Sequence, residues 1–332
     1  MKTISKAMIM AAGVGSRLDP LTRDIPKPLV PIVNRPVMDI LLDKLSHIGI
    51  KSVVANTHYL ADQIIDRYSK NHFGIDFHYI KEDTLSGTAG GLKKCQSFFE
   101  KGENFIVMSA DGLSDADLKK GIEVHLKSGA IATIGVKKID KSQVPHFGVV
   151  VTDENGFITE FQEKPPIELA KSNLINTGIY IFDYKIFDYI PENTFYDFAK
   201  NVFPKLLAEH AINTFEIDEY WSDIGTLEQY VKSTVDVLNG ECDICSEVLC
   251  NKISESKLPM DITMGGYAVV GRNCRVGENV TMINVIIWDN VEVKSGLWLE
   301  NVIIGNNTKI YTNVKDRIIG SNEIIQEDMI KK

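Results

Sequence analysis

Short apolar runs alternate with amphipathic stretches from the N-terminus to about residue 238. The apolar runs predict strands at residues 7–11, 52–56, 76–80, 105–109 and 131–136. The amphipathic stretches predict helices at residues 36–47, 61–69, 89–99 and 115–128. Pro36 would occupy the first turn of its helix, where a missing N–H costs nothing. This alternation is typical of parallel strands with crossover helices, so we expect a Rossmann-like, mostly parallel mixed sheet flanked by helices.

Residues 147–165 change to a period of two, and Asn155-Gly156 interrupts the alternation. Asn-Gly between two alternating runs is a strong hairpin signal. We therefore expect an antiparallel hairpin on one side of the sheet.

A different pattern begins after Gly240. Val270, Val276 and Met282 are spaced six residues apart, with Gly271 and Gly277 after the first two, and Ile304 and Ile310 repeat the same interval. Six-residue spacing is typical of coils in a parallel β-helix, and an irregular β-meander is the alternative. We expect a catalytic domain at 1–240, a linker at 241–262 and a short left-handed β-helix at 263–332.

Composition narrows the possible partners. The 332 residues carry a formal charge of -9, which argues against a nucleic-acid surface but allows a small anionic ligand. The sequence has no apolar window long enough to span a membrane and does not begin like a secretory signal, so we expect a cytoplasmic protein. Cys242, Cys245 and Cys250 form C-x2-C-x4-C without a nearby fourth ligand, which favours reduced cysteines over zinc.

The first predicted strand leads into a glycine-rich turn, Gly13-Val14-Gly15-Ser16-Arg17. Such a turn can bring backbone N–H groups close to a phosphate. Leu18 stands where a dinucleotide-binding motif has its third glycine. Arg17 and the proline-flanked Lys27 supply two cations for a polyanion, although a solvated surface turn would contain the same glycines.

Further motifs follow in a fixed order: "GTAGGL" at 87–92, "SADG" at 109–112, "FGVV" at 147–150, "EKP" at 163–165, "NTGIYIF" at 176–182 and "YWSDIGT" at 220–226. Together with the glycine-rich turn, this order resembles the sugar-1-phosphate nucleotidylyltransferases. Ser16 replaces the usual threonine, and Ala110 replaces a common glycine.

The resemblance implies a role for each matching residue. The residues expected to bind the nucleotide are Ala12, Gly13, Gly15, Ser16, Glu82, Gly87 and Thr88. Catalysis falls to Arg17, Lys27, Asp111 and Lys164. Asp111 and Asp223 would ligate Mg2+, and the sugar phosphate would be bound by Gly148, Glu163, Lys164 and Asn176.

Each role has a simpler structural alternative. By itself Asp111 reads as a helix cap, Asp223 and Asn176 as turn residues, and Glu163 and Lys164 as solvated charges. Their ordered occurrence favours the functional interpretation. A reaction that brings two polyanions together needs charge neutralisation and in-line placement, and Mg2+ with Arg17, Lys27 and Lys164 would supply the charge.

The resemblance thus implies an enzyme that converts a nucleoside triphosphate and a hexose 1-phosphate into an NDP-hexose and pyrophosphate. We also expect a homo-oligomer, because a short β-helix has coil ends and apolar side chains to bury against a partner. Mannose-1-phosphate guanylyltransferase is the first choice. UTP–glucose-1-phosphate uridylyltransferase is the alternative, and an inactive regulatory subunit of the same fold is a third possibility.

The preference for GTP depends on Glu82. A carboxylate only accepts hydrogen bonds, which suits the adjacent N1–H and 2-amino donors of guanine better than the edge of uracil. A solvated loop charge is the alternative interpretation of Glu82.

Overall fold

The computed structural model describes residues 4–70, 73–243 and 252–327. It divides into two compact units. The first joins Met1–Gly13 to Ile40–Asp223, and the second joins Val14–Asp39 to Ile224–Lys332. The predicted catalytic domain at 1–240 therefore draws on both units. We call residues 14–39, which carry Gly15, Arg17 and Lys27, the signature segment.

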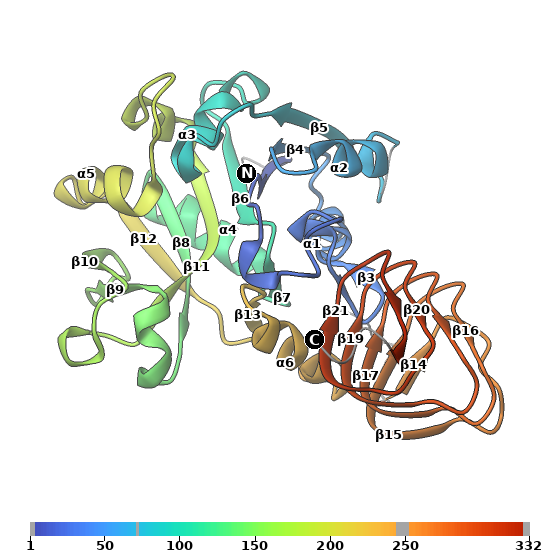
Figure 1. Cartoon of the computed structure of the whole chain (residues 1–332). Coiled ribbons are helices and arrows are strands. Elements are labelled where there is room, and N and C mark those ends of the chain that lie inside the picture. Colours follow the sequence, from blue (N-terminus) through green and yellow to red (C-terminus); the bar gives the residue numbers. More distant parts are fainter. Residues whose placement is uncertain (1–3, 71–72, 244–251, 328–332) are drawn as a thin grey trace. The chain divides into compact units, whose positions relative to one another are not determined.

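The first unit contains a large mixed sheet (Figure 1). Its strands are β1 (Lys6–Ala11), β4 (Ser52–Thr57), β5 (Asp76–Lys81), β6 (Asn104–Ser109), β8 (Ala132–Lys138), β9 (Gly148–Thr152), β10 (Ile158–Glu163), β11 (Leu174–Asp183) and β12 (Ile212–Glu216). The order is β10-β9-β11-β6-β1-β4-β5, and β8 pairs with β11 and β12. Strands β6, β1, β4 and β5 are parallel, whereas β11 runs antiparallel to β6. The predicted mixed sheet is confirmed.

The helices are α1 (Val37–His47), α2 (Ala61–Tyr68), α3 (Gly87–Lys94), α4 (Leu118–Ser128), α5 (Phe203–Ala208) and α6 (Leu227–Leu238). Three of the predicted helices have different boundaries in the structure. Pro36 lies in β3 (Arg35–Pro36) and not in the helix that follows it. Helix α3 begins at Gly87 and ends at Lys94, before a 3-10 turn at Gln96–Phe98. Helix α4 begins only at Leu118, because Asp117 caps it by accepting from the N–H groups of Lys119 and Lys120.

The predicted hairpin is present as the antiparallel pair β9 and β10. Asp153 Oδ1 accepts hydrogen bonds from the backbone N–H groups of Asn155 and Phe157, each at 2.9 Å. Gly156 takes a φ of 80°, which a residue with a side chain rarely adopts. The turn is therefore fixed by the Asp and Gly that flank Glu154 and Asn155.

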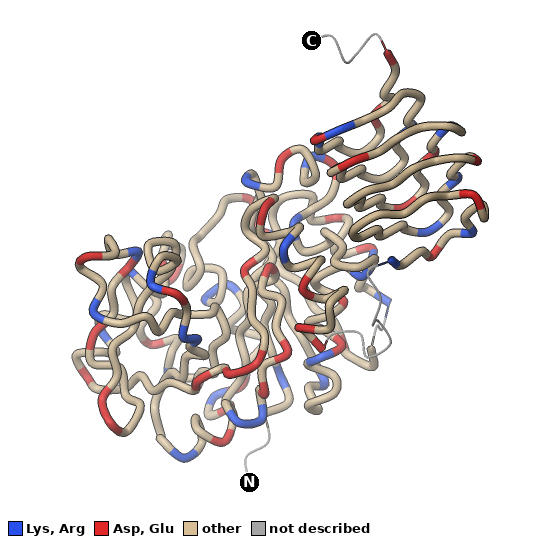
Figure 2. The backbone as a smooth tube through the Cα atoms, turned by 90° about the horizontal axis from the view of Figure 1, so that it is seen from below, with Lys and Arg blue, Asp and Glu red and all other residues tan. Residues whose placement is uncertain are grey.

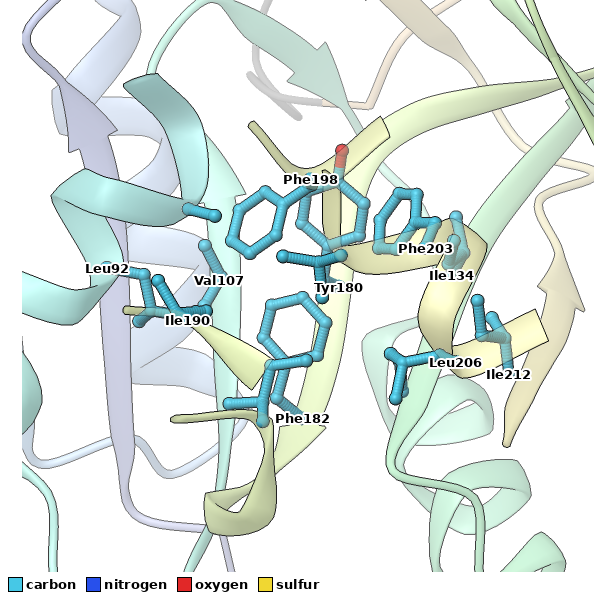
Figure 3. Packing of buried hydrophobic residues seen from close by; sticks show 14 of the residues in the cluster. Leu92, Val107, Ile134, Tyr180, Phe182, Ile190, Phe198, Phe203, Leu206 and Ile212 are labelled. Carbon is cyan, nitrogen blue, oxygen red and sulfur yellow. The ribbon is translucent and has the colours of Figure 1, made fainter. Parts of the chain in front are cut away.

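Aromatic side chains fix strand β11 in the core of the first unit (Figure 3). Tyr180 stacks on Phe182 with ring centroids 5.4 Å apart, and Phe198 stacks on Phe203 at 5.8 Å. Such aromatic pairs add about 0.5–1.5 kcal/mol each beyond the burial of their surface. This packing holds the strand on which Asn176 is placed.

The second unit ends in two parallel sheets. The longer strands are β14 (Lys252–Ser254), β15 (Thr263–Val270), β17 (Thr281–Ile287), β19 (Trp298–Ile304) and β21 (Val314–Ile319). The shorter ones are β16 (Arg275–Val276), β18 (Glu292–Val293), β20 (Lys309–Ile310) and β22 (Ile324–Ile325). From β15 onward the chain alternates between the two sheets, so each circuit forms one coil.

The six-spaced apolar positions are buried: Val270, Val276, Met282, Ile304 and Ile310. This winding is what a parallel β-helix requires. The left-handed sense of the helix stays a prediction. Strand β14 lies inside the predicted linker and pairs with β15.

An asparagine ladder (Asn273, Asn290, Asn307 and Asn322) follows the corner of successive coils. Each member has a φ between 56° and 64°, a conformation that asparagine tolerates better than most residues. Each Nδ2 donates to the Oδ1 of the next member, at 3.3, 3.1 and 3.0 Å. The ladder ends where Asn322 Nδ2 donates to Asp24 Oδ2 of the signature segment at 3.3 Å.

The signature segment also contacts other parts of the second unit, and it contains the short hairpin of β2 (Pro31–Ile32) and β3. Asn34 Nδ2 donates to the carbonyl of Val270 at 3.0 Å. Tyr230 of α6 donates its hydroxyl to the carbonyl of Pro31 at 3.0 Å and accepts from Trp288 Nε1 at 2.9 Å. Trp288 is therefore buried within its own unit.

Charges of both signs are interspersed along the described chain (Figure 2). Among the described helices, none combines the length and the apolar content needed to cross a lipid bilayer.

Candidate active site

Four parallel strands of the first unit end at one edge of the sheet. Ala11 pairs with Thr57, and Thr57 pairs with Lys81, while Met10 pairs with Ser109. The residues that follow these strand ends therefore meet at one edge. Open α/β sheets bind ligands at the carboxyl ends of their strands. Ala12, Gly13, Glu82 and Asp111 all follow these ends.

The turn around Gly15 is compact. Gly15 has a φ of 74°, and its carbonyl accepts from Leu18 N and Thr22 Oγ1, each at 2.9 Å. A Cβ atom on Gly15 would lie 3.0 Å from the Cβ of Lys27. The fold thus brings the glycine-rich turn and Lys27 together, while Ser16 and Arg17 remain exposed. Leu18 is fully buried, which explains why a third glycine does not stand there.

Lys27 begins a 3-10 turn, Lys27–Leu29, between two prolines. Pro26 is extended, and its carbonyl accepts from Leu29 N at 2.9 Å. Pro28 is buried, and the Lys27 side chain is half-buried. The prolines and these hydrogen bonds leave the Lys27 backbone little freedom.

Two of the predicted acidic residues are neighbours. Asp111 follows β6 and precedes β7 (Gly112–Ser114), which pairs antiparallel with β13 (Trp221–Asp223). Asp223 lies opposite Gly112 in this ladder. Ser109 Oγ donates to Asp111 Oδ1 and orients that carboxylate. More than a hundred residues separate these two aspartates in the sequence, and the short β7–β13 ladder brings them together.

This pair suits a hard divalent cation. Mg2+ is commonly bound by one or two carboxylates together with waters and substrate phosphates. Within residues 4–70, 73–243 and 252–327, no three acidic, histidine or cysteine side chains gather as a metal site. A cation at Asp111 and Asp223 would therefore complete its shell with water or phosphate oxygens.

Three predicted sugar-binding residues lie at one level of neighbouring strands. Gly148 pairs with Glu163 across the β9–β10 hairpin. Ile175 pairs with Val149, so Asn176 lies one residue further along, level with Gly148. A Cβ on Gly148 would lie 2.7 Å from the ring of Phe161 and 3.2 Å from Glu163 Oε2, so a side chain there would displace both residues.

Asn176 and Lys164 are held by local contacts. Asn176 Oδ1 accepts from Gly178 N and Asn176 Nδ2 donates to Tyr180 Oη, each at 3.0 Å. Lys164 has a φ of 48°, a conformation that costs a residue with a side chain about 1–2 kcal/mol. Its N–H donates to the carbonyl of Phe147 at 3.1 Å, and its side chain is exposed.

The glycines of "GTAGGL" make room for neighbouring groups. A Cβ on Gly87 would lie 2.4 Å from the Tyr196 carbonyl oxygen, and one on Gly90 would lie 2.9 Å from that of Thr194. Thr88 Oγ1 donates to Asp197 Oδ2 and accepts from Phe198 N, each at 2.9 Å. The start of α3 is thus fixed against residues 194–198.

Glu82 is 3% exposed, so the interpretation of it as a solvated loop charge was wrong. Its carboxylate accepts from Asn56 Nδ2 at 2.7 Å, from Lys94 Nζ at 2.9 Å, and from the N–H and hydroxyl of Ser86. Burial would raise the pKa of Glu82, but the hydrogen bonds from Ser86, Asn56 and Lys94 outweigh it and hold the pKa below its ordinary value. Asn56 and Lys94 do not belong to any of the recognised motifs, so the sequence did not identify them as partners of Glu82.

The cysteine motif is only partly visible. Cys242 is buried, and Cys245 and Cys250 lie outside the described residues.

Residues 6–240 match the family model described as "Nucleotidyl transferase". A UTP–glucose-1-phosphate uridylyltransferase of Synechocystis sp. is 38% identical over 338 aligned positions, which cover 96% of this chain and 78% of that protein. A mannose-1-phosphate guanylyltransferase of Mycobacterium tuberculosis is 29% identical, covering 89% of this chain and 82% of that protein. The crystal structure of a UDP-glucose pyrophosphorylase complexed with UDP-glucose has the same fold, with a TM-score of 0.63 at 21% identity over 72% of this chain and 100% of that one.

Proposed function

The chain belongs to the nucleotidyl transferase family, as a sugar-1-phosphate nucleotidylyltransferase, and we propose that its substrates are UTP and glucose 1-phosphate. The observation that carries this choice is the likeness to the Synechocystis uridylyltransferase, which is closer and spans more of this chain than the likeness to the mycobacterial guanylyltransferase. The product is then UDP-glucose.

The surroundings of Glu82 remove the sequence argument for GTP. The sequence argument for GTP requires a carboxylate that is available to the base. Both Glu82 oxygens already accept hydrogen bonds from the protein, at 2.7 Å from Asn56 and 2.9 Å from Lys94. The argument for guanine therefore loses its basis, and GTP with mannose 1-phosphate becomes the second candidate, favoured by relatives with that activity.

In the proposed reaction, a phosphate oxygen of the sugar 1-phosphate attacks the α-phosphorus of the triphosphate. The bond from the α-phosphorus to its bridging oxygen breaks, and pyrophosphate leaves with the electron pair. Positioning and charge neutralisation supply most of the catalysis in such transfers. Arg17 and Lys27 would neutralise the triphosphate, and Lys164 would bind the phosphate of the sugar.

Enzymes of this family generally use a divalent metal, and we propose Mg2+ held by Asp111 and Asp223. The ion would neutralise negative charge on the α-phosphate. The sugar hydroxyls would be bound by Gly148, Glu163 and Asn176. This proposal is supported by the strand register, which places the three residues at the same level of neighbouring strands. Ala12, Gly13, Gly15 and Ser16 would face the triphosphate, and Gly87 and Thr88 the nucleoside.

The test is pyrophosphate release by the purified protein with four NTPs against glucose, mannose, galactose and glucosamine 1-phosphates. We expect the highest kcat/KM with UTP and glucose 1-phosphate. A maximum with GTP and mannose 1-phosphate would establish the second candidate. Release with none of the sixteen pairs would favour the inactive regulatory subunit.

A further inference from the structure

A polar relay (Asn56, Glu82, Ser86 and Lys94) holds the loop between β5 and α3. Asn56, Glu82 and Ser86 are buried, and Lys94 is exposed. Glu82 lies at its centre, one residue past the end of β5. Asn56 lies on β4, and Lys94 is the last residue of α3. The relay therefore ties a sheet strand and the far end of a helix to one carboxylate.

The relay requires a group that only accepts hydrogen bonds. Asn56 Nδ2, Ser86 N and Lys94 Nζ are all donors, and they approach both oxygens of Glu82. A glutamine in either amide orientation would direct an NH2 group at one of these donors. The need for glutamate at this position is thus explained by the protein's own donors, without a base.

The relay continues to the strand before the glycine-rich turn. Asn56 Oδ1 accepts from Ala11 N at 3.2 Å, at the end of β1. The Asn56 side-chain amide therefore links two segments through its oxygen and its nitrogen. One is the end of β1, which leads to Ala12 and Gly13, and the other is the loop from Glu82 to Gly87. Gly91 leaves space for this amide, because a Cβ there would lie 2.5 Å from Asn56 Nδ2.

We infer that Asn56, Glu82 and Lys94 are positioning residues that hold two nucleotide-binding segments of the first unit in register, and that Glu82 does not read the base. The inference rests on the proposed triphosphate site but not on the choice between UTP and GTP. Discrimination between bases would then fall to other groups, such as the backbone of residues 83–88.

The structure offers a matched pair of lysines for the test. Lys93 and Lys94 are adjacent on α3 and line the same groove, but Lys93 Nζ donates to the carbonyl of Phe187 at 3.1 Å. Lys94→Met removes the relay contact, and Lys93→Met removes an equal charge without touching Glu82. Lys94→Arg keeps a cationic donor and should restore most of the lost function.

We expect Glu82→Gln and Lys94→Met to raise the KM for UTP and for GTP by the same factor, about tenfold or more, with kcat within threefold of the parent. Lys93→Met should stay within twofold of the parent. The double variant Glu82→Gln with Lys94→Met should lose little more than the worse single variant, because both remove one interaction.

A change of tenfold or more in the UTP to GTP preference of Glu82→Gln would overturn the inference and make Glu82 a base-reading residue. Equal behaviour of Lys94→Met and Lys93→Met would also overturn it. If the parent has no turnover, the same comparison is made on the rise in melting temperature caused by UTP and by GTP. That measurement separates failure of the relay from failure of the proposed reaction.

Discussion

Gly15 and Lys27 are in contact across the turn of the signature segment: a Cβ on Gly15 would lie 3.0 Å from the Cβ of Lys27. Gly15 also has a left-handed φ of 74°. A side chain at position 15 would be strained by its backbone and would push Lys27 away. The placement of Lys27 therefore depends on the absence of a side chain twelve residues earlier in the sequence.

The variant Gly15→Ala tests this dependence. We expect kcat/KM to fall by more than tenfold, because the shift misplaces a phosphate-binding cation. Gly49→Ala is the control, since Gly49 has a φ of 97° but no atom within 4 Å of the added Cβ. Loss of stability without loss of activity in Gly15→Ala, as expected for the control, would contradict the proposed role of Lys27.

The acidic pair provides a second prediction. Asp111→Asn and Asp223→Asn should each lower kcat by two or more orders of magnitude, because each weakens the metal that neutralises the α-phosphate. Titration of activity with Mg2+ should show a higher half-saturating concentration in both variants. Asp218→Asn, which alters an exposed salt bridge to Lys120, should behave as the parent. Normal Mg2+-dependent activity in both variants of the pair would exclude this metal site.

The chain after residue 240 supports the signature segment. We expect a protein that ends at Gly240 to melt at a lower temperature and to contain fewer subunits in solution, because the proposed homo-oligomer would lose its contacts. Light scattering and a thermal melt measure both effects. An unchanged number of subunits and an unchanged melting temperature would contradict the role of the tail in stability and assembly.

A single substitution tests the same support without removing the tail. Trp288 Nε1 donates to the Tyr230 hydroxyl at 2.9 Å, and that hydroxyl donates to the Pro31 carbonyl at 3.0 Å. Trp288→Phe deletes the first of these two hydrogen bonds. We expect the melting temperature to fall and the KM for the triphosphate to rise a few-fold. Trp298→Phe, at a half-buried position without this hydrogen bond, is the control. Identical melting and KM for the two variants would show that the contact is unimportant.

Glu82 predicts a dependence of stability on pH. Its pKa lies below the ordinary value of 4.5 in the folded protein. A depressed carboxyl pKa contributes stability above the unfolded pKa, and that contribution is lost as the pH falls through the folded pKa. The difference in melting temperature between the parent and Glu82→Gln should therefore be greatest at pH 7 and shrink below about pH 4.5. A constant difference from pH 7 to pH 4 would contradict the charged relay.

The sequence predicted the parts of the site that follow from strand order. Strands β1, β4, β5 and β6 were recognisable as apolar runs, and parallel strands bring their ends to one edge. The β7–β13 ladder is too short to stand out from its loops, so only the family resemblance, and no pattern of strands, brought Asp111 and Asp223 together. The relay was hidden for another reason: its asparagine and its lysine follow no distinctive spacing in the sequence.

The signature segment was misleading in a different way. Chain order suggested that Gly15 and Lys27 belong with the sheet, because they follow its first strand. In the structure, tertiary contacts with Val270, Tyr230 and Asn322 group the segment with the C-terminal part of the chain. The asparagine ladder escaped notice because its steps of 17, 17 and 15 residues are irregular.

The end of that ladder limits how the tail can change in length. Neighbouring parallel strands lie about 4.8 Å apart, so one inserted or deleted coil would displace Asn322 by that distance. A displacement of this size breaks the 3.3 Å hydrogen bond to Asp24 and withdraws support from the segment that carries Arg17 and Lys27. Repeat regions usually tolerate gain and loss of units. Here the number of coils is constrained, because only one number places the Asn322 corner within hydrogen-bonding distance of Asp24.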